Sequence, residues 1–137
     1  YTSVYGHTRE AVEYLAAELE KRGQTVTVTD LARSDMAEAV EDAFRYSRLV
    51  VAAASYDADV FPPMHDFLHH LAIKNFSKRR IGIIENGSWA PSAGKAMRKI
   101  IDTFKDVTVA DTMVTIVSTL KPTDTPALER LADEVLA

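Results

Sequence analysis

The stretch Leu49-Val50-Val51-Ala52-Ala53-Ala54 is apolar at every position. A strand with one face in water alternates between apolar and polar residues, whereas a parallel strand covered by helices on both faces is apolar throughout. We therefore expect a central parallel strand over residues 49–54. Ile81-Gly82-Ile83-Ile84 has the same character and predicts a second buried strand.

Segments with helical spacing alternate with these strands. From residue 8 to residue 22, Val12, Leu15, Ala16 and Leu19 fall at i, i+3, i+4 and i+7, the spacing of one helix face. Similar stripes predict helices around residues 36–44, 62–71, 97–104 and 125–135, the last with Thr125 as N-cap. β-branched runs predict a strand at 25–29 and a final strand region made of 107–109 and 113–117.

This alternation predicts a doubly wound, three-layer α/β fold, with helices on both faces of a parallel five-stranded sheet. Right-handed crossovers leave few topologies, and one of them has the strand order 2-1-3-4-5. In that order a ligand binds beyond the carboxyl ends of the strands, next to strands 1 and 3. We expect the loops that follow strands 1, 3 and 4 to carry the function.

The chain opens at Tyr1-Thr2-Ser3, without an initiator Met, and leads at once into a glycine-containing turn and a helix. If Tyr1 ends a central strand, the apolar residues of that strand should lie upstream in a longer parent polypeptide. We therefore expect the chain to be a fragment.

Composition narrows the function classes. The 137 residues, 47% of them hydrophobic, suit one domain spanning residues 1–137. A formal net charge of -4 argues against nucleic acid or an anionic membrane surface as partner. The absence of cysteine excludes disulfides and thiolate chemistry and is compatible with a cytoplasmic location. No apolar run reaches the roughly 20 residues of a membrane span.

The first loop, residues 2–8, combines hydroxyl side chains with a glycine before a helix. Backbone N–H groups, the hydroxyls of Ser3 and Thr8 and the positive end of the helix could hold a phosphate group, and Gly6 would allow close approach. The loop has neither the Walker pattern nor the G-x-G-x-x-G fingerprint, so a monophosphate fits better than a dinucleotide. An ordinary strand-to-helix turn with a cap remains the alternative.

The second and third loops supply aromatic side chains. Residues 55–64 present Tyr56 and Phe61 beside polar backbone, and residues 85–94 contain the only tryptophan, Trp89. A flat amphipathic ring system needs such a wall, together with backbone donors and acceptors at its edge. Each aromatic residue alone could equally be part of the core, but three unusual loops at one sheet edge favour a shared ligand.

These loops resemble those of a known family. Residues 3–8, Ser-Val-Tyr-Gly-His-Thr, look like the phosphate loop of the flavodoxin-like domain of flavodiiron proteins (A-type flavoproteins), and Tyr56 through Met64 and Gly87-Ser88-Trp89 resemble its second and third flavin loops. The resemblance covers essentially the whole chain. It implies the flavodoxin-like fold, FMN as cofactor and the work of an electron carrier rather than of an enzyme in its own right.

The resemblance also implies partners. These domains pass electrons to a diiron site in a preceding metallo-β-lactamase-like domain, which reduces dioxygen or nitric oxide. The diiron domain belongs to the same protein or to a dimer mate, and the electron donor would be rubredoxin or an NAD(P)H reductase.

Carried over by position, the resemblance implies contacts from all three loops to FMN. The phosphate contacts would come from Ser3, Val4, Tyr5, Gly6, His7 and Thr8; the isoalloxazine and ribitol contacts from Ser55, Tyr56, Asp57, Ala58 and Phe61; and the contacts closing the other side from Asn86, Gly87, Ser88 and Trp89. No catalytic or metal-ligating residue is implied within the domain.

Two departures from the family pattern are His7, where members often have Asn, and Asp59, where the second loop often has Gly. We also hypothesise that Asp57, Asp59 and Glu85 cluster at the loop tips and oppose the negative charge of a reduced flavin, which would lower its potential. The alternative is that these carboxylates point into water and are screened.

Two further interpretations place the chain in other classes of protein. Thr119-Leu120-Lys121-Pro122 is similar to the Lys-Pro of phospho-accepting receiver domains, but Thr2-Ser3 stands where a receiver needs an acidic pair for Mg²⁺. A self-contained flavodoxin-fold quinone reductase would keep the flavin but needs insertions for which the chain has no room. His65 and His69 have the i, i+4 spacing of zinc ligands, without an evident third ligand.

Overall fold

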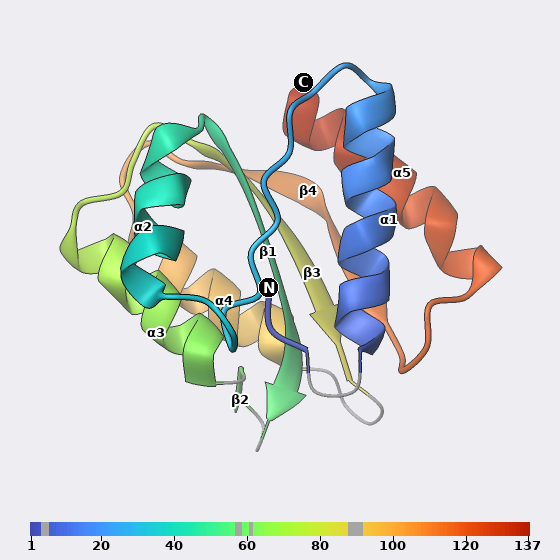
Figure 1. Ribbon diagram of the computed structural model, residues 1–137, viewed down its shortest axis with the longest axis horizontal. Helices are drawn as coiled ribbons and strands as arrows, with labels where there is room; N and C mark the ends of the chain where they lie inside the picture. Colours follow the sequence, from blue (N-terminus) through green and yellow to red (C-terminus); the bar gives the residue numbers. More distant parts are fainter. Residues whose placement is uncertain (4–5, 57–58, 61, 88–91) are drawn as a thin grey trace.

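The computed structural model describes residues 1–3, 6–56, 59–60, 62–87 and 92–137, and of Tyr56, Asp59 and Val60 it describes the backbone alone. Its sheet has the order β2-β1-β3-β4. Strands β1 (Arg48–Tyr56), β3 (Arg80–Asn86) and β4 (Thr108–Ile116) run parallel, and the two-residue β2 (Asp59–Val60) pairs antiparallel with the end of β1. The expected parallel α/β sheet is thus present (Figure 1).

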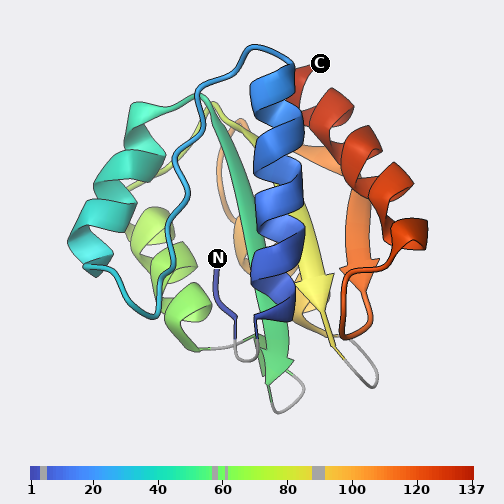
Figure 2. The ribbon, with the colours of Figure 1, turned by 45° about the vertical axis from the view of Figure 1, so that its right-hand side comes forward.

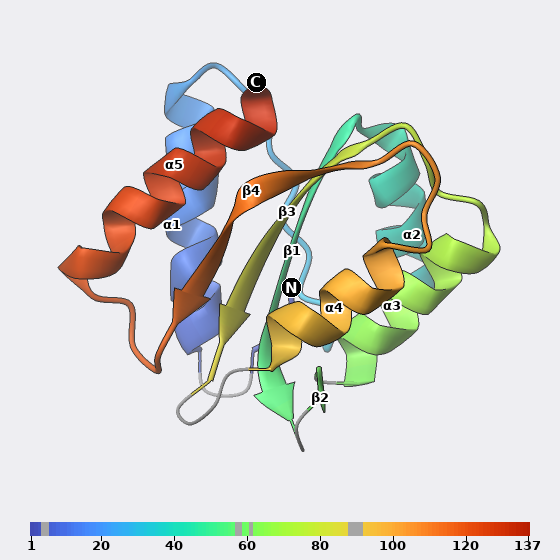
Figure 3. The same cartoon turned by 180° about the vertical axis from the view of Figure 1, so that it is seen from behind.

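Helices cover both faces of the sheet, which makes three layers (Figures 1 and 3). One face carries α1 (His7–Lys21) and α5 (Thr125–Leu136), and the other carries α2 (Met36–Arg45), α3 (Pro62–Ile73) and α4 (Ala93–Ile101). A short 3₁₀ turn, η1 (Pro122–Asp124), precedes α5. None of the helices in the described ranges combines the length and the apolarity that crossing a membrane requires.

Two apolar clusters pack against the two faces of the sheet. Phe76 and Met64 belong to the cluster under α2, α3 and α4, and Leu15 and Leu131 belong to the cluster under α1 and α5. Strand β3 is buried from Ile81 to Asn86, because it lies between β1 and β4 and has helices above and below. The apolar runs that predicted two-sided strands are therefore the centre of the fold.

The final strand region, 107–109 and 113–117, forms the single strand β4, whose pairing with β3 is irregular between Ile81 and Ile83. Other element boundaries differ from the predicted ones. Helix α4 begins at Ala93 and ends at Ile101, so Phe104 of the predicted stripe lies after the helix. Helix α5 includes Thr125 as its first residue, with Asp124 at the N-cap position, because the η1 turn brings the chain into helical conformation earlier. The two-residue strand β2 had no signal in the sequence.

The predicted strand over residues 25–29 is not formed, and the described sheet contains three parallel strands rather than five. The segment runs along the sheet as extended chain beside the amino terminus. Tyr1 lies between it and β1: the Tyr1 amino group donates to the Thr29 carbonyl (2.8 Å), and the Leu31 N–H donates to the Tyr1 carbonyl (2.9 Å). On the other side, the Thr2 N–H donates to the Ala52 carbonyl (3.0 Å). Residues 1–2 thus lie between the segment 25–31 and β1, hydrogen-bonded to both.

Candidate functional site

The carboxyl edge of the sheet brings the predicted loops to neighbouring positions. Thr2 is hydrogen-bonded to Ala52, Ala54 is opposite Asn86, and Asn86 is opposite Ile116. Because neighbouring strands lie about 4.8 Å apart, the chain segments that follow these residues emerge side by side. In Figure 2 the arrowheads of β1 and β3 and the start of α1 lie at this edge.

The first loop ends at an open helix N-terminus. Gly6 is the N-cap residue of α1, with φ 86°, a conformation that glycine adopts without strain. Its N–H donates to the Ser3 hydroxyl (3.0 Å), and no described side chain caps the helix. A Cβ added at Gly6 would meet no described atom within 4 Å.

Two hydroxyl residues near this N-terminus are buried. Thr2 is fully buried and its hydroxyl has no hydrogen-bond partner in the described part of the chain, and Thr8, in the first turn of α1, is 2% exposed. A buried hydroxyl without a partner is costly. The Thr2 hydroxyl is therefore a candidate to donate to a bound group.

The N-terminus of α4, at the same edge, is occupied by the protein itself. The Ser55 hydroxyl oxygen accepts from the N–H groups of Ser92 (2.8 Å) and Ala93 (3.1 Å), and the Glu85 carboxylate accepts from the Gly94 N–H (3.2 Å). Helix α3 offers little in its first turn, because it begins with Pro62 and Pro63, which have no N–H. Of these three helix starts, α1 therefore has the most free N–H groups for an anion.

The redox hypothesis required Glu85 to lie at a loop tip, and the structure does not place it there. It is 6% exposed, and its carboxylate accepts from the Thr115 hydroxyl (3.3 Å) as well as from Gly94. A Cβ at Gly94 would lie 2.9 Å from the Glu85 carboxyl carbon and would also meet the Met113 sulfur, so the two strands and α4 are in close contact. Glu85 fastens α4 to the sheet; the side chains of Asp57 and Asp59 lie outside the described residues.

Asn86 uses its side-chain amide inside the protein. Its Nδ2 donates to the Ser118 carbonyl (2.8 Å) and its Oδ1 accepts from the Ser118 N–H (3.1 Å). This pair of bonds holds Ser118 at φ 63°. The Gly87 N–H donates to the Ile116 carbonyl (3.2 Å). Asn86 thus positions the start of the third loop against the turn that follows β4.

Several predicted site residues lie in the parts of the chain that the structure does not describe. Val4, Tyr5, Asp57, Ala58, Phe61, Ser88 and Trp89 lie outside the described residues, as does the Tyr56 side chain. The described members divide into two groups. Ser3, Gly6, His7 and Thr8 surround the start of α1, where the His7 Nδ1 lies 3.4 Å from the Glu10 carboxylate, and Ser55, Asn86 and Gly87 are hydrogen-bonded within the protein.

The other signals in the sequence lead to structural contacts. The His65 and His69 rings are stacked, with centroids 6.4 Å apart, and among the described residues no three His, Asp or Glu side chains gather as a metal site. The Lys121 ammonium group donates to the carbonyls of Val117 (2.6 Å) and Thr119 (2.9 Å) and so closes the turn before α5.

Sequence reasoning placed Thr2 in the first loop and Ser92 and Gly94 in the third, but it did not predict the burial of Thr2 or the hydrogen bonds at the start of α4. Ser92 directly before an apolar helical stripe is an N-cap signal and could have located the start of α4. Thr2 gave no such signal, because its burial depends on strands and helices distant in sequence.

Comparisons with known proteins give the fold. No protein-family model matches the sequence, and no curated protein matches it. The structure is similar to rubredoxin oxygen:oxidoreductase from Desulfovibrio gigas (TM-score 0.91, 14% identity, 98% of this chain and 33% of that one).

Other solved structures are similar over the same residues. A flavodoxin from the domain Archaea matches with a TM-score of 0.83 (16% identity, 97% of this chain and 90% of that one). The Flv1 flavodiiron core from Synechocystis sp. PCC6803 matches with a TM-score of 0.80 (20% identity, 98% and 33%). This chain thus spans about a third of the two larger proteins. With a parallel sheet between two helical layers and this agreement in structure, the chain has the flavodoxin-like α/β fold.

Proposed function

We propose that the chain is an FMN-binding electron-transfer domain that passes electrons to a diiron site reducing dioxygen or nitric oxide in its parent protein. The observation that carries the flavin part is the contrast between helix starts at the carboxyl edge. Ser55 and Glu85 occupy the N–H groups of α4, whereas no described side chain caps α1. The flavodoxin-like fold and the resemblance of the three loops support the same conclusion.

The phosphate of FMN would bind at the start of α1. Ser3, Gly6, His7 and Thr8, together with Val4 and Tyr5, would surround it, with backbone N–H groups as the main donors. A dianion here interacts favourably with the helix dipole without any cationic side chain. The unpaired hydroxyl of Thr2 would gain a hydrogen-bond acceptor.

The ring of FMN would lie between the second and third loops. Tyr56, Asp57, Ala58 and Phe61 would form one wall, and Ser88 and Trp89 the other. Ser55 and Asn86 would act mainly as positioning residues, because their side chains already hold α4 and Ser118. When bound, FMN supplies reversible electron transfer, and the protein supplies orientation and the exclusion of water.

The diiron partner follows from the resemblance. Two of the similar structures are a rubredoxin oxygen:oxidoreductase and a flavodiiron core, and this chain covers 33% of each. We propose a metallo-β-lactamase-like domain in the parent polypeptide as the electron acceptor, with rubredoxin or an NAD(P)H reductase as the donor and a cytoplasmic location. If the coding sequence has a start codon directly before Tyr1, preceded by a stop codon, the partner in the same chain is excluded while the flavin proposal stands.

The decisive experiment is a titration of the purified chain with FMN, in which binding is monitored by the quenching of flavin fluorescence. A titration with riboflavin is run in parallel. We expect stoichiometric binding of FMN and at least tenfold weaker binding of riboflavin, which lacks the phosphate. Gly6→Ala should weaken FMN binding at least tenfold, because it disturbs the positive φ at the phosphate loop.

Gly23→Ala is the matched control. Gly23 has φ 82° at the other end of α1 and open space around it, so the same strain falls far from the site. This variant should lose stability but bind FMN as before. Absence of FMN binding by the unaltered chain would overturn the proposal. Transfer of phosphate from acetyl phosphate would then favour the receiver reading, and turnover of quinone with NAD(P)H and bound FMN would favour the reductase.

A further inference from the structure

The phosphate position proposed at the start of α1 offers N–H donors. The first intrahelical bond joins the Glu10 N–H to the Gly6 carbonyl (3.1 Å), so the N–H groups of residues 7–9 have no partner within the helix. The buried Thr2 hydroxyl, which has no partner among the described residues, belongs to the segment that leads into this turn. These groups are neutral, and a cation beside them would bind a phosphate dianion more tightly.

His7 can supply this positive charge. It is the first residue of α1 and directly follows the N-cap residue Gly6. Because the Cα–Cβ bonds of a helix tilt toward its N-terminus, the side chain of a first-turn residue leans toward the end where an anion binds. The His7 side chain is 34% exposed, so a ligand can reach it. An imidazole gains or loses its charge between pH 5 and pH 8, so this cation would depend on pH.

The Glu10 carboxylate determines which ring nitrogen of His7 faces the helix start. Its Oε1 lies 3.4 Å from the His7 Nδ1, one turn further along α1. A carboxylate accepts hydrogen bonds, so Nδ1 carries the proton in this pair, and a neutral ring would then have an unprotonated Nε2. Such an Nε2 cannot donate to a phosphate oxygen. Only the imidazolium can donate to Glu10 and to a phosphate at the same time.

Charged groups on α1 and on the neighbouring α5 have other partners. Arg9 is paired with the Glu13 carboxylate (2.8 Å), and the Glu129 carboxylate accepts from the Tyr14 hydroxyl (2.9 Å). Lys121, in the turn before α5, donates to two backbone carbonyls. Within the described ranges, the charged group in hydrogen-bonding contact with His7 is therefore the Glu10 carboxylate.

The charged side chains of β1 and β3, which lie under α1, also point to other elements. Arg48 and Arg80, at the amino ends of these strands, donate to backbone carbonyls at the end of α5. The Glu85 carboxylate accepts from Gly94 of α4, on the opposite face of the sheet. The charge of the His7 ring is thus set chiefly by Glu10 and by whatever anion binds at the helix start.

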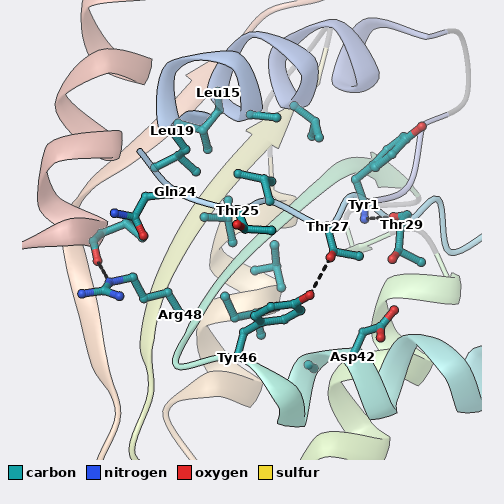
Figure 4. Close-up of a pocket in the computed structure, with 18 of the residues that line it drawn as sticks. Tyr1, Leu15, Leu19, Gln24, Thr25, Thr27, Thr29, Asp42, Tyr46 and Arg48 are labelled. Atoms are coloured by element: carbon teal, nitrogen blue, oxygen red, sulfur yellow. Dashed lines mark hydrogen bonds between the residues drawn. The ribbon is translucent and has the colours of Figure 1, made fainter. Parts of the chain in front are cut away.

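The Tyr1 amino group titrates in the same pH range as an imidazole. It lies at one end of a groove of about 470 Å³ between residues 24–29 and the first half of β1 (Figure 4). Burial lowers its pKa from 8.0 to about 6, and it donates to the Thr29 carbonyl (2.8 Å). The described lining of the groove includes neither Gly6 nor His7. Titration of this amine should therefore affect the stability of the chain rather than its affinity for a phosphate.

We propose that Glu10 is a positioning residue for FMN: its carboxylate holds His7 as an imidazolium, whose Nε2–H donates to the phosphate. Where the ring of the free protein is neutral, it takes up a proton from solvent when FMN binds, because the phosphate dianion favours the charged form. No electron moves in this step. This role rests on the proposed flavin function, and it makes FMN affinity fall as the pH rises.

The test measures the dissociation constant of FMN at pH 6.5 and pH 8.5 for the unaltered chain, for His7→Asn and for Glu10→Gln. Both pH values lie above the second pKa of a phosphate ester, about 6, so the ligand stays largely a dianion. We expect the affinity of the unaltered chain to fall about five- to tenfold between them. His7→Asn should bind FMN with nearly the same affinity at both, and riboflavin, which lacks the phosphate, should show no such dependence.

Glu10→Gln distinguishes positioning from simple repulsion. Removing a carboxylate beside a phosphate would, by repulsion alone, tighten FMN binding at both pH values. If the carboxylate holds the imidazolium, Glu10→Gln should weaken binding about threefold at pH 6.5 and should not weaken it at pH 8.5. Glu13→Gln is the matched control, because Glu13 is an exposed carboxylate of the same helix that pairs with Arg9 instead. It should change neither dissociation constant by more than about twofold.

Proton uptake is a measurement that a merely structural role of the pair would not change. Calorimetric titration with FMN at pH 7.5, in two buffers of different ionisation enthalpy, should show uptake of part of a proton by the unaltered chain and by Glu13→Gln, and essentially none by His7→Asn. Equal FMN affinity of the unaltered chain at both pH values, or tighter binding by Glu10→Gln at pH 6.5, would overturn the role of Glu10 and His7 while the flavin proposal stands. Absence of FMN binding would overturn both.

Discussion

The two edges of β1 differ sharply. Toward β3, the strand is paired in register from Arg48 to Ala54, and the ends of both strands are fastened to α4 by Ser55 and Glu85. Toward residues 24–29, the same strand borders a groove of about 470 Å³, and only Ala52 is bonded to residues 1–2. One edge is closed by the described residues, and the other is open along half of its length.

This difference separates the edge of β1 that leads to the proposed site from the edge that lies under α1. The closed edge fixes the direction in which the second and third loops leave the sheet, so the proposed flavin site depends on pairing that is already present. The open edge affects the stability of the layer that supports α1, whose first turn would hold the phosphate. Substitutions at the two edges should therefore change the unfolding free energy by different amounts.

The largest difference is expected from truncation of one apolar side chain on each edge. Ile83 in β3 is 1% exposed, and Ile83→Ala should cost about 2–5 kcal/mol of unfolding free energy, because it leaves a cavity in a closed core. Leu49 is half-buried beside the groove, so Leu49→Ala should cost about 1 kcal/mol. Urea unfolding measures both, and equal losses would show that the two edges are packed alike.

Enlarging a side chain should also cost more stability beside the closed edge than beside the groove. Gly94→Ala brings a Cβ against the Met113 sulfur and within 2.9 Å of the Glu85 carboxyl carbon, and we expect a loss of about 1–3 kcal/mol of unfolding free energy despite the better helix propensity of alanine. Ala16 of α1 lines the groove, and Ala16→Leu should change stability by less than about 1 kcal/mol. Thermal and urea unfolding give both values; a tolerated Gly94→Ala would contradict the close contact of α4 with the sheet.

The amino group at the end of the groove predicts a pH dependence. Its pKa is about 6 in the folded chain and near 8 when unfolded, so the unfolded state binds more protons between these values and stability should rise from pH 6 to pH 8. We expect a gain of about 1–2 kcal/mol. Acetylation of Tyr1 should remove the slope, because it removes the titrating amine. An unchanged slope after acetylation would contradict this assignment.

The smallest expected effects concern single hydroxyl groups. Ser55→Ala removes the acceptor for the Ser92 and Ala93 N–H groups and should cost about 1 kcal/mol, with faster exchange of those two amides. On the open side, Tyr46→Phe removes an exposed hydrogen bond to Thr27 (2.9 Å) and should cost less than about 0.5 kcal/mol. Ser55→Thr keeps a hydroxyl and is the control; no change in amide exchange for Ser55→Ala would refute its capping role.

The sequence predicted the strands and helices that have strong periodicity. Apolar runs at 49–54 and 81–84 gave two central strands, and the stripe from Val12 to Leu19 gave α1, because burial on one or two faces leaves a direct mark on the order of residues. The β-branched run at 25–29 carries the same kind of mark but forms no strand. A strand needs a partner along its length, and local propensity does not supply one.

In the candidate site, too, some features could be predicted from the sequence and others could not. Gly6 at the start of α1, with its positive φ, could be anticipated from the position of a glycine before a helix. The roles of Glu85 and Asn86 could not, because the first bonds to Gly94 and Thr115 and the second to Ser118, residues that only the packing of strands and helices brings near.

By itself, the order of apolar and polar residues determined that this chain is a layered α/β domain with its loops of interest at the carboxyl ends of the strands. Only the tertiary structure decided which helix N-terminus stays free and which edge of β1 stays open. The physical reason is that hydrogen bonds between distant segments depend on positions in space, whereas the hydrophobic pattern of each segment depends only on its own faces.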